Sequence, residues 1–322
     1  MKTRVTDLFG CKYPILQGAM AGFGNWKFAA AVANAGAHGT ITASVSKTPE
    51  GLREDIKRCR AATGGSFGVN LSFGICPRIE EMLEVCIEEW VPVETALYKP
   101  DSLAKRIEES GLPWIHKSAR VKDARHAEAL GVDAIIVVGL EGTGFKSPEQ
   151  LPTLTTTLLA TRQLKVPFIA AGGIADARGF LGALGMGAEG IMMGTAFMLT
   201  QESPMKQSLK DEILKTGPDD PRLLRRVLAS ADPKAYAEVQ AMRGKVPLEE
   251  WLGMLERVNI KDEDWKKSGE GAAETVSASD PTRMVSLAIA AIDHIPTVKE
   301  LIDSIVRGAE EGLKRLNLMK DG

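Results

Sequence analysis

Residues 166–200, VPFIAAGGIADARGFLGALGMGAEGIMMGTAFMLT, decide the fold of this chain. The segment contains two short apolar runs, 167–171 and 190–193, whose length and composition are typical of buried strands. The small residues between them, about 176–184, predict a helix. The segment therefore reads as a strand, a helix and a second strand, with a glycine turn after each strand.

The two turns, Gly172-Gly173 and Gly194-Thr195, leave backbone N–H groups open at the ends of their strands. Open N–H groups and the dipole of a following helix together favour a bound anion. In (β/α)8 barrels the loops after strands 7 and 8 recurrently hold a phosphate. Either turn alone is equally well explained as a simple chain reversal, but the pair favours a phosphate site.

The first 200 residues repeat the same alternation of strand and helix. Apolar runs followed by turn residues predict six earlier strands, at 13–20, 39–43, 67–71, 91–95, 114–117 and 134–138. Eight such units predict an α/β protein with a parallel sheet. The eightfold count favours a closed (β/α)8 TIM barrel over a doubly wound sheet, and in a barrel the site lies on the loops after the strands.

The alternation stops after the eighth strand. Helices are expected at 206–215, 222–229, 233–242, 248–257, 283–293 and 297–316, with a turn-rich segment at 268–279. We interpret this part as a smaller helical insertion after strand 8. The expected division is a barrel formed by residues 1–203 and 282–322, and a helical substrate-side domain formed by residues 204–281.

The overall composition, 44% hydrophobic and 25% charged, is that of a globular protein with an ample core. A net charge of −2 gives no reason to expect nucleic acid or an anionic membrane as a partner. The four cysteines form no CxxC pair and no zinc-like cluster with histidine, so we expect free thiols and no metal site. The N-terminal residues lack the apolar run of a signal peptide, which favours the cytoplasm.

Two further glycine-rich segments, 139–144 and 182–187, have the order G-x-x-G-x-G rather than G-x-G-x-x-G. Neither stands between a first strand and its helix, where a dinucleotide-binding fingerprint belongs. A Rossmann domain is therefore not expected.

Several motifs in chain order carry a resemblance to a known family. They are Pro14-Ile-Leu-Gln-Gly-Ala-Met20, Ala30-Ala-Val-Ala-Asn-Ala-Gly36, Phe67-Gly-Val-Asn-Leu71, Ile115-His-Lys117, Gly131-Val-Asp133, Ala170-Ala-Gly-Gly-Ile-Ala-Asp-Ala-Arg-Gly179 and Met193-Gly-Thr195. With them the chain resembles the nitronate monooxygenase (2-nitropropane dioxygenase) family of FMN-dependent barrels, near its NADH:quinone reductase branch. The family also includes FMN-dependent enoyl-acyl-carrier-protein reductases.

The resemblance implies that the phosphate belongs to FMN. Family roles, carried over to matching positions, imply a set of cofactor-binding residues: Ala19, Met20, Ala21, Ser72, Lys117, Thr143, Ala171, Gly172, Gly173, Gly194 and Thr195. Lys117 is the candidate that tunes the flavin, because a fixed cation beside the ring stabilises the anionic reduced form. The alternative for Lys117 is an ordinary solvated lysine.

The chain departs from the family pattern in the loop after strand 6. Members usually carry a catalytic histidine there, whereas this chain has Phe145. Phenylalanine neither accepts nor donates a proton, so the catalytic residue is left unassigned. Glu141 and Tyr98 are weak substitutes, Glu141 being equally well explained as a carboxylate that orders its loop. Lys146 is a candidate for substrate contact on position alone.

The histidines do not replace the missing one. His116 is expected to point away from Lys117, because side chains alternate along a strand. His38 lies at the start of its strand, which is the wrong end of a barrel. His126 and His294 are expected at solvated helix positions.

Three functions remain open from the sequence. The first is an FMN-dependent oxidoreductase that oxidises alkyl nitronates or a related small molecule, with NAD(P)H-dependent reduction of a quinone or enoyl group as its close alternative and NAD(P)H then as a co-substrate. The second is a phosphate-ligand barrel without redox chemistry. The third is a flavin- or nucleotide-binding protein that has lost catalysis. A homodimer is left open.

Overall fold

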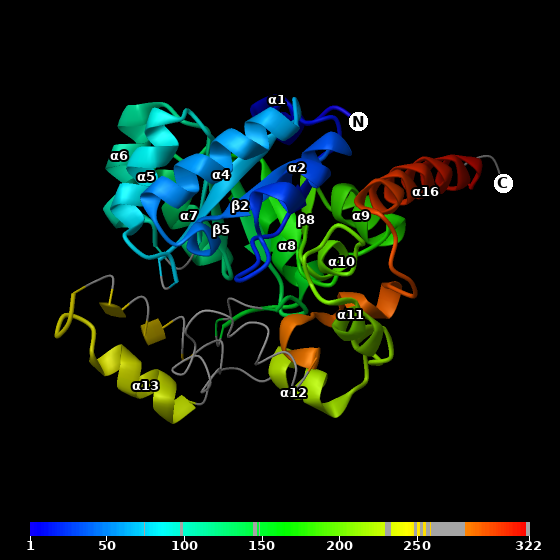
Figure 1. Cartoon of the computed structure of the whole chain (residues 1–322). Helices are drawn as coiled ribbons and strands as arrows, with labels where there is room; N and C mark the ends of the chain where they lie inside the picture. Colours follow the sequence, from blue (N-terminus) through cyan, green and yellow to red (C-terminus); the bar gives the residue numbers. More distant parts are fainter. Residues whose placement is uncertain are drawn as a thin grey trace.

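The computed structural model of the chain describes residues 1–73, 75–96, 99–143, 147, 149–228, 233–247, 250–251, 254–255, 258 and 281–319. Eight parallel strands form one sheet in the order β1-β8-β7-β6-β5-β4-β3-β2. Their bounds are β1 Ile15–Gln17, β2 Gly39–Thr42, β3 Phe67–Ser72, β4 Val93–Ala96, β5 Trp114–Ser118, β6 Ala134–Val138, β7 Phe168–Ala171 and β8 Gly190–Met193. A bridge between Leu16 and His38 joins β1 to β2. The expected (β/α)8 barrel is therefore confirmed (Figure 1).

Helices alternate with the strands around the outside of the barrel (Figure 1). The main ones are α2 Trp26–Asn34, α4 Pro49–Ala62, α5 Ile79–Glu88, α6 Asp101–Ser110, α7 Val121–Ala129, α8 Thr153–Gln163, α9 Ala177–Gly185 and α16 Val298–Leu318. Side chains of Asn25, Thr48 and Asp176 accept a backbone N–H in the first turn of α2, α4 and α9. Such caps satisfy donors that the helix itself leaves unpaired, which fixes where each helix begins.

Alternation along the strands separates two apolar layers. The side chains on one face of the strands pack outward against the helices, and those on the other face fill the barrel. The inner cluster includes Leu16, Ile115, Ala134, Ile136, Val138, Ile169, Ala171 and Met192. Helix α1 (Arg4–Phe9), which the sequence patterns did not predict, adds Val5 and Phe9 to this cluster.

His38, at the start of β2, packs against α1 rather than against a site. Its ring centroid lies 4.3 Å from that of Phe9, and its Nδ1 lies 2.7 Å from the Ser66 hydroxyl. Burial lowers the pKa of His38 from 6.5 to about 3. This agrees with its expected place outside the site.

The low pKa of His38 makes stability depend on pH. Between pH 6.5 and about 3 the unfolded chain binds a proton that the folded chain does not, so acidification favours unfolding. The expected loss between pH 6.5 and 4.5 is about 2 kcal/mol, because the slope approaches roughly 1.4 kcal/mol per pH unit only below the pKa of the unfolded histidine. His38→Gln should flatten the slope of unfolding free energy against pH in urea melts. Equal slopes for wild type and His38→Gln would contradict this assignment.

After β8 the chain forms α10 Thr195–Met198, α11 Gln207–Leu214, α12 Pro221–Leu228 and α13 Pro233–Ala241. The single helix expected at 283–293 is wrong, because this segment forms two short 3-10 helices, η2 Pro281–Met284 and η3 Leu287–Ala291. The break falls at Ser286, which is extended and caps η3 through its hydroxyl. The expected helix at 248–257 is only partly described, and the turn-rich segment at 268–279 lies outside the described residues.

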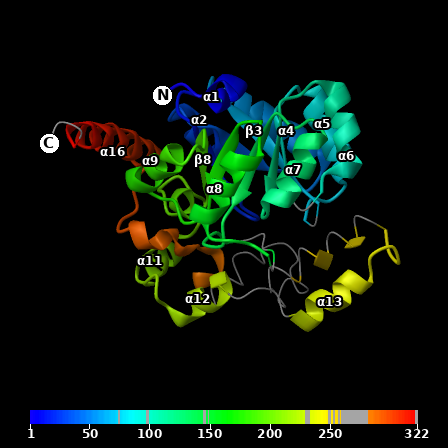
Figure 2. The ribbon, with the colours of Figure 1, turned by 180° about the vertical axis from the view of Figure 1, so that it is seen from behind.

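Helices α11 and α12 lie with the 281–291 segment at one end of the barrel, whereas α16 packs along α9 (Figures 1 and 2). The division into a barrel and a helical domain at residues 204–281 stays a prediction. Among the described helices, none has the length and apolar character needed to span a membrane.

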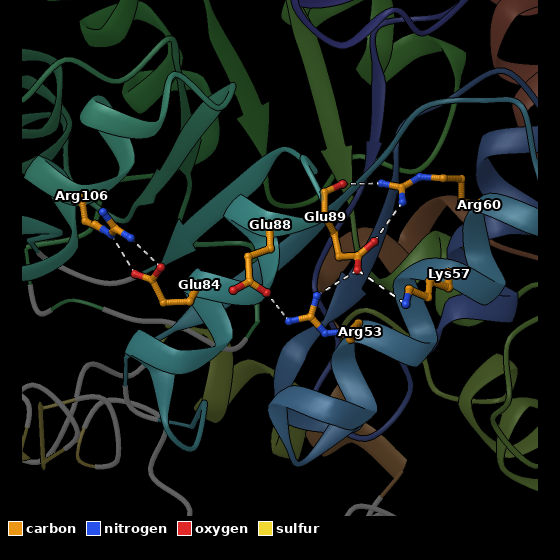
Figure 3. A network of polar contacts seen from close by, with 7 residues as sticks. All are labelled: Arg53, Lys57, Arg60, Glu84, Glu88, Glu89 and Arg106. Carbon is orange, nitrogen blue, oxygen red and sulfur yellow. Dashed lines mark hydrogen bonds and ion pairs between the residues drawn. The ribbon is translucent and has the colours of Figure 1, made fainter.

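The outer surface carries a network of ion pairs that joins α4, α5 and α6 (Figure 3). Glu89 pairs with Arg53 at 3.0 Å, Arg60 at 3.2 Å and Lys57 at 3.9 Å. Glu84 pairs separately with Arg106 at 2.6 Å. Surface pairs of this kind each contribute little to stability, because water and salt screen the charges.

Candidate active site

A row of polar side chains lines the inside of β3, β4 and β5. Val69 and Leu71 belong to the outer apolar layer, so Asn70 and Ser72 face the barrel axis. Asn70 is paired in register with Glu94 on β4, and the Asn70 amide donates to the Glu94 carboxylate at 2.9 Å. These polar groups are enclosed within the barrel.

Lys117 on β5 faces the same interior. Ile115, two residues earlier, belongs to the inner cluster, and Lys117 is paired in register with Ala96 on β4. The lysine is half-buried. His116 points the other way, with its Nδ1 2.8 Å from the Thr95 hydroxyl, as expected. The strand therefore aims a cation, not an imidazole, into the barrel.

Glu94 is 5% exposed and lies close enough to Lys117 for electrostatic attraction. Burial raises the pKa of the Glu94 carboxyl above its ordinary value, and attraction to Lys117 and the hydrogen bond from Asn70 offset only part of this rise. The sequence patterns did not identify Asn70 and Glu94 as candidate site residues. Asn70 stands two positions before Ser72, and the period-2 rule places both on one face, but its pairing with Glu94 requires the sheet register.

The segment after β1 lies beside the end of β8. The Gly18 amide donates to the Met193 carbonyl at 2.8 Å, and the Met20 amide donates to the Thr42 hydroxyl of β2 at 3.0 Å. Met20 is buried, and its neighbours Ala19 and Ala21 are half-buried. The loop is thus fixed between β2 and β8, with small side chains on either side of Met20.

The loops after β6 and β7 pack through glycines. A Cβ on Gly139 would stand 2.0 Å from the Thr153 hydroxyl, and one on Gly172 would stand 3.0 Å from Gly139 and Gly142. Gly172 and Gly173 both have positive φ, 102° and 72°, a backbone conformation that other residues rarely adopt. The turn after Ala171 therefore depends on both glycines.

Glu141 orders this corner of the molecule. Its carboxylate accepts from the amide and the hydroxyl of Thr153, both at 2.7 Å, at the first turn of α8. Pro152, the N-cap residue of α8, offers no side-chain cap, so Glu141 supplies one from the preceding loop. The Glu141 carbonyl also accepts from the Leu287 amide at 3.1 Å. Of the two interpretations of Glu141, loop ordering is the one with observed contacts.

The end of β8 combines a fixed hydroxyl with open space. The Thr195 hydroxyl lies 2.9 Å from that of Ser286 and accepts from the Ser286 amide at 3.0 Å. Gly194, by contrast, has no heavy atom within 4 Å of the place where a Cβ would stand, apart from its chain neighbours, among the described residues. Thr195 begins α10, and the first-turn amides of a helix have no acceptor within that helix.

The observed arrangement fits the phosphate and ring of FMN. Space at Gly194 and open amides suit the phosphate, and an interior cation at Lys117 suits the ring. Thr143 is half-buried at the edge of the glycine corner. Gly144, Phe145, Lys146 and Tyr98 lie outside the described residues. No cluster of three metal-ligating side chains is found in the described part of the chain.

Comparisons with known proteins identify the family of this chain. A family model described as nitronate monooxygenase matches residues 2–95 and 76–308. The (3aS,4S,5R,7aS)-5-hydroxy-7a-methyl-1-oxo-octahydro-1H-indene-4-carboxyl-CoA dehydrogenase of Rhodococcus jostii is 30% identical over 99% of both chains. A probable nitronate monooxygenase of Staphylococcus aureus is 32% identical over 68% of this chain and 74% of its own.

Among solved structures, FabK from Thermotoga maritima matches with a TM-score of 0.77 and 32% identity, over 98% of this chain and 99% of its own. The family model spans most of the sequence, and the fold and whole-length relatives agree with it. The expected enzyme class, an FMN-dependent oxidoreductase, is confirmed at the level of the family. This chain belongs to the nitronate monooxygenase family.

Proposed function

We propose that this protein is an FMN-dependent oxidoreductase that acts on a coenzyme A thioester. As a reductase it would take electrons from NAD(P)H, and as a dehydrogenase it would pass the electrons of the thioester to NAD(P)+. The observation that carries the proposal is the length of the match: the carboxyl-CoA dehydrogenase relative aligns over 99% of this chain. The nitronate monooxygenase relative aligns over only 68%. Because we expect the segments beyond the barrel strands to contribute to substrate selection, we take a relative that matches over its whole length as the better guide to the substrate.

A second candidate is nitronate oxidation, which the family name favours. Phe145 argues against it, because it stands where members usually carry the histidine that handles the proton. A bound flavin would accept electrons in either case. We therefore place nitronate oxidation second.

In the proposed site the chain's own residues bind and orient the cofactor. Gly172, Gly173, Gly194 and the amides after it would hold the phosphate, and Ala171 and Thr143 flank that corner. Ala19, Met20 and Ala21 would contact the ring, with Ser72 beside it. Lys117 would stabilise negative charge on the reduced ring.

Anaerobic mixing tests the proposal. Holoenzyme is mixed separately with NADH, NADPH, a set of saturated cyclic acyl-CoA thioesters, and propyl nitronate, and the visible flavin absorbance is followed. Bleaching by a thioester, or by NAD(P)H with recovery on adding an enoyl-CoA, supports the proposal. Bleaching by propyl nitronate alone would replace it with the second candidate.

Phe145→His is expected to raise nitronate turnover by about tenfold or more, since a positioned acid–base group contributes about 10²–10⁴-fold. The measurement is oxygen uptake with propyl nitronate, and Phe145→Leu serves as the matched control without a ring nitrogen. Unchanged turnover in Phe145→His would show that position 145 does not face the flavin.

A further inference from the structure

We propose that Glu94 is a positioning residue that acts as a counter-charge to Lys117 and limits how strongly the site stabilises negative charge on a bound flavin. The proposal rests on the placement of the flavin at the mouth of the barrel but not on the substrate class. Nothing in the sequence patterns singled out Glu94. Its role follows from its place inside the sheet.

Glu94 occupies an interior position that is normally apolar. Its neighbours in register are Asn70 on β3 and Ile115 on β5, and Ile115 belongs to the inner apolar cluster. A charged carboxylate is expensive to bury unless it is paired and hydrogen-bonded. Glu94 is only 5% exposed in this layer, so its carboxylate needs partners nearby.

Among the described residues, the Glu94 carboxylate has one hydrogen-bond donor and one cation as partners. The Asn70 amide donates to Oε1 of Glu94 at 2.9 Å, which holds the carboxylate in place. Lys117, on the next strand, attracts it. Burial raises the pKa of the Glu94 carboxyl, and the cation and the donor offset part of that rise because both favour the ionised carboxylate. The three side chains thus form a unit in which Glu94 offsets the lysine charge.

This arrangement of Asn70, Glu94 and Lys117 predicts how removing the Glu94 charge would change the stability of an anionic flavin. Removing the negative charge of Glu94 leaves Lys117 uncompensated, so any anionic form of the ring is stabilised. Without Lys117, burial drives Glu94 to its neutral form, because an unpaired buried carboxyl takes up a proton. The consequence of removing Glu94 should therefore depend on Lys117 being present.

The test is a sulfite titration of the FMN holoenzyme at pH 7, because sulfite adds to an oxidised flavin and leaves the ring negatively charged. Glu94→Gln keeps an acceptor for Asn70 but removes the charge. We expect sulfite to bind about tenfold more tightly, which corresponds to about 1.4 kcal/mol. In a Lys117→Met background the same change should alter sulfite affinity less than about twofold. The midpoint potential of Glu94→Gln should be more positive.

Glu84→Gln is the matched control, since it breaks an ion pair with Arg106 on the outer surface (Figure 3). It should leave sulfite affinity unchanged. An unchanged affinity in Glu94→Gln, or an equal gain with and without Lys117, would overturn the proposal. Sulfite reads the flavin itself, so failure of thioester turnover would leave this result intact and count only against the proposed substrate.

Discussion

Gly194→Asp is expected to give a folded protein that binds FMN at least about a hundredfold more weakly than wild type. The backbone at Gly194 has φ −101° and ψ −69°, which any residue adopts, and no described atom beyond its chain neighbours lies within 4 Å of the new Cβ. The fold should therefore accept the side chain. A carboxylate in the proposed phosphate site both fills the space and repels the anion.

The measurement is FMN affinity of the apoprotein, followed by quenching of flavin fluorescence, together with a thermal melt. Gly182→Asp is the matched control, because Gly182 is exposed on α9 and equally free of atoms within 4 Å. Its affinity for FMN should match that of wild type. If Gly194→Asp bound FMN as tightly as wild type, the proposed position of the phosphate at the end of β8 would be wrong.

Lys117→Met is expected to slow reduction of the flavin by about a hundredfold while changing FMN affinity much less. A single positioned donor at a site of developing charge typically contributes about 10²–10³-fold. Methionine keeps the length and apolar stem of the side chain but removes the charge inside the barrel. The flavin's midpoint potential should become more negative in parallel.

Stopped-flow reduction by NAD(P)H or the active thioester gives the rate, and a dye-equilibrated titration gives the potential. Lys122→Met, on the exposed face of α7, is the control and should behave as wild type. A wild-type rate and potential in Lys117→Met would show that Lys117 is an ordinary solvated lysine, the alternative left open by the sequence.

The barrel itself was predictable because its signals are local. Most strands are short segments with buried apolar residues, and the observed strands match the expected ones to within a few residues. The prediction of one helix at 283–293 was wrong because hydrophobic periodicity does not reveal a capping residue inside an apolar segment. There Ser286 takes an extended conformation and hydrogen-bonds Thr195, 91 residues away.

The site was only partly predictable. Gly172, Gly173 and Gly194 stand at strand ends, where turn chemistry identifies them, and motif resemblance supplied Lys117 and Ser72. Glu94 gave no sequence signal, since its meaning depends on which strands become neighbours. The β3–β4–β5 register alone brings Asn70, Glu94 and Lys117 together.

The most direct test of the central claim is a structure of the protein with FMN added, supported by the visible spectrum of the same sample. The account predicts a yellow protein with one flavin, its phosphate at Gly173 and Gly194 and its ring beside Met20 and Lys117. A protein that stays colourless after incubation with FMN, or a flavin phosphate bound elsewhere, would contradict it.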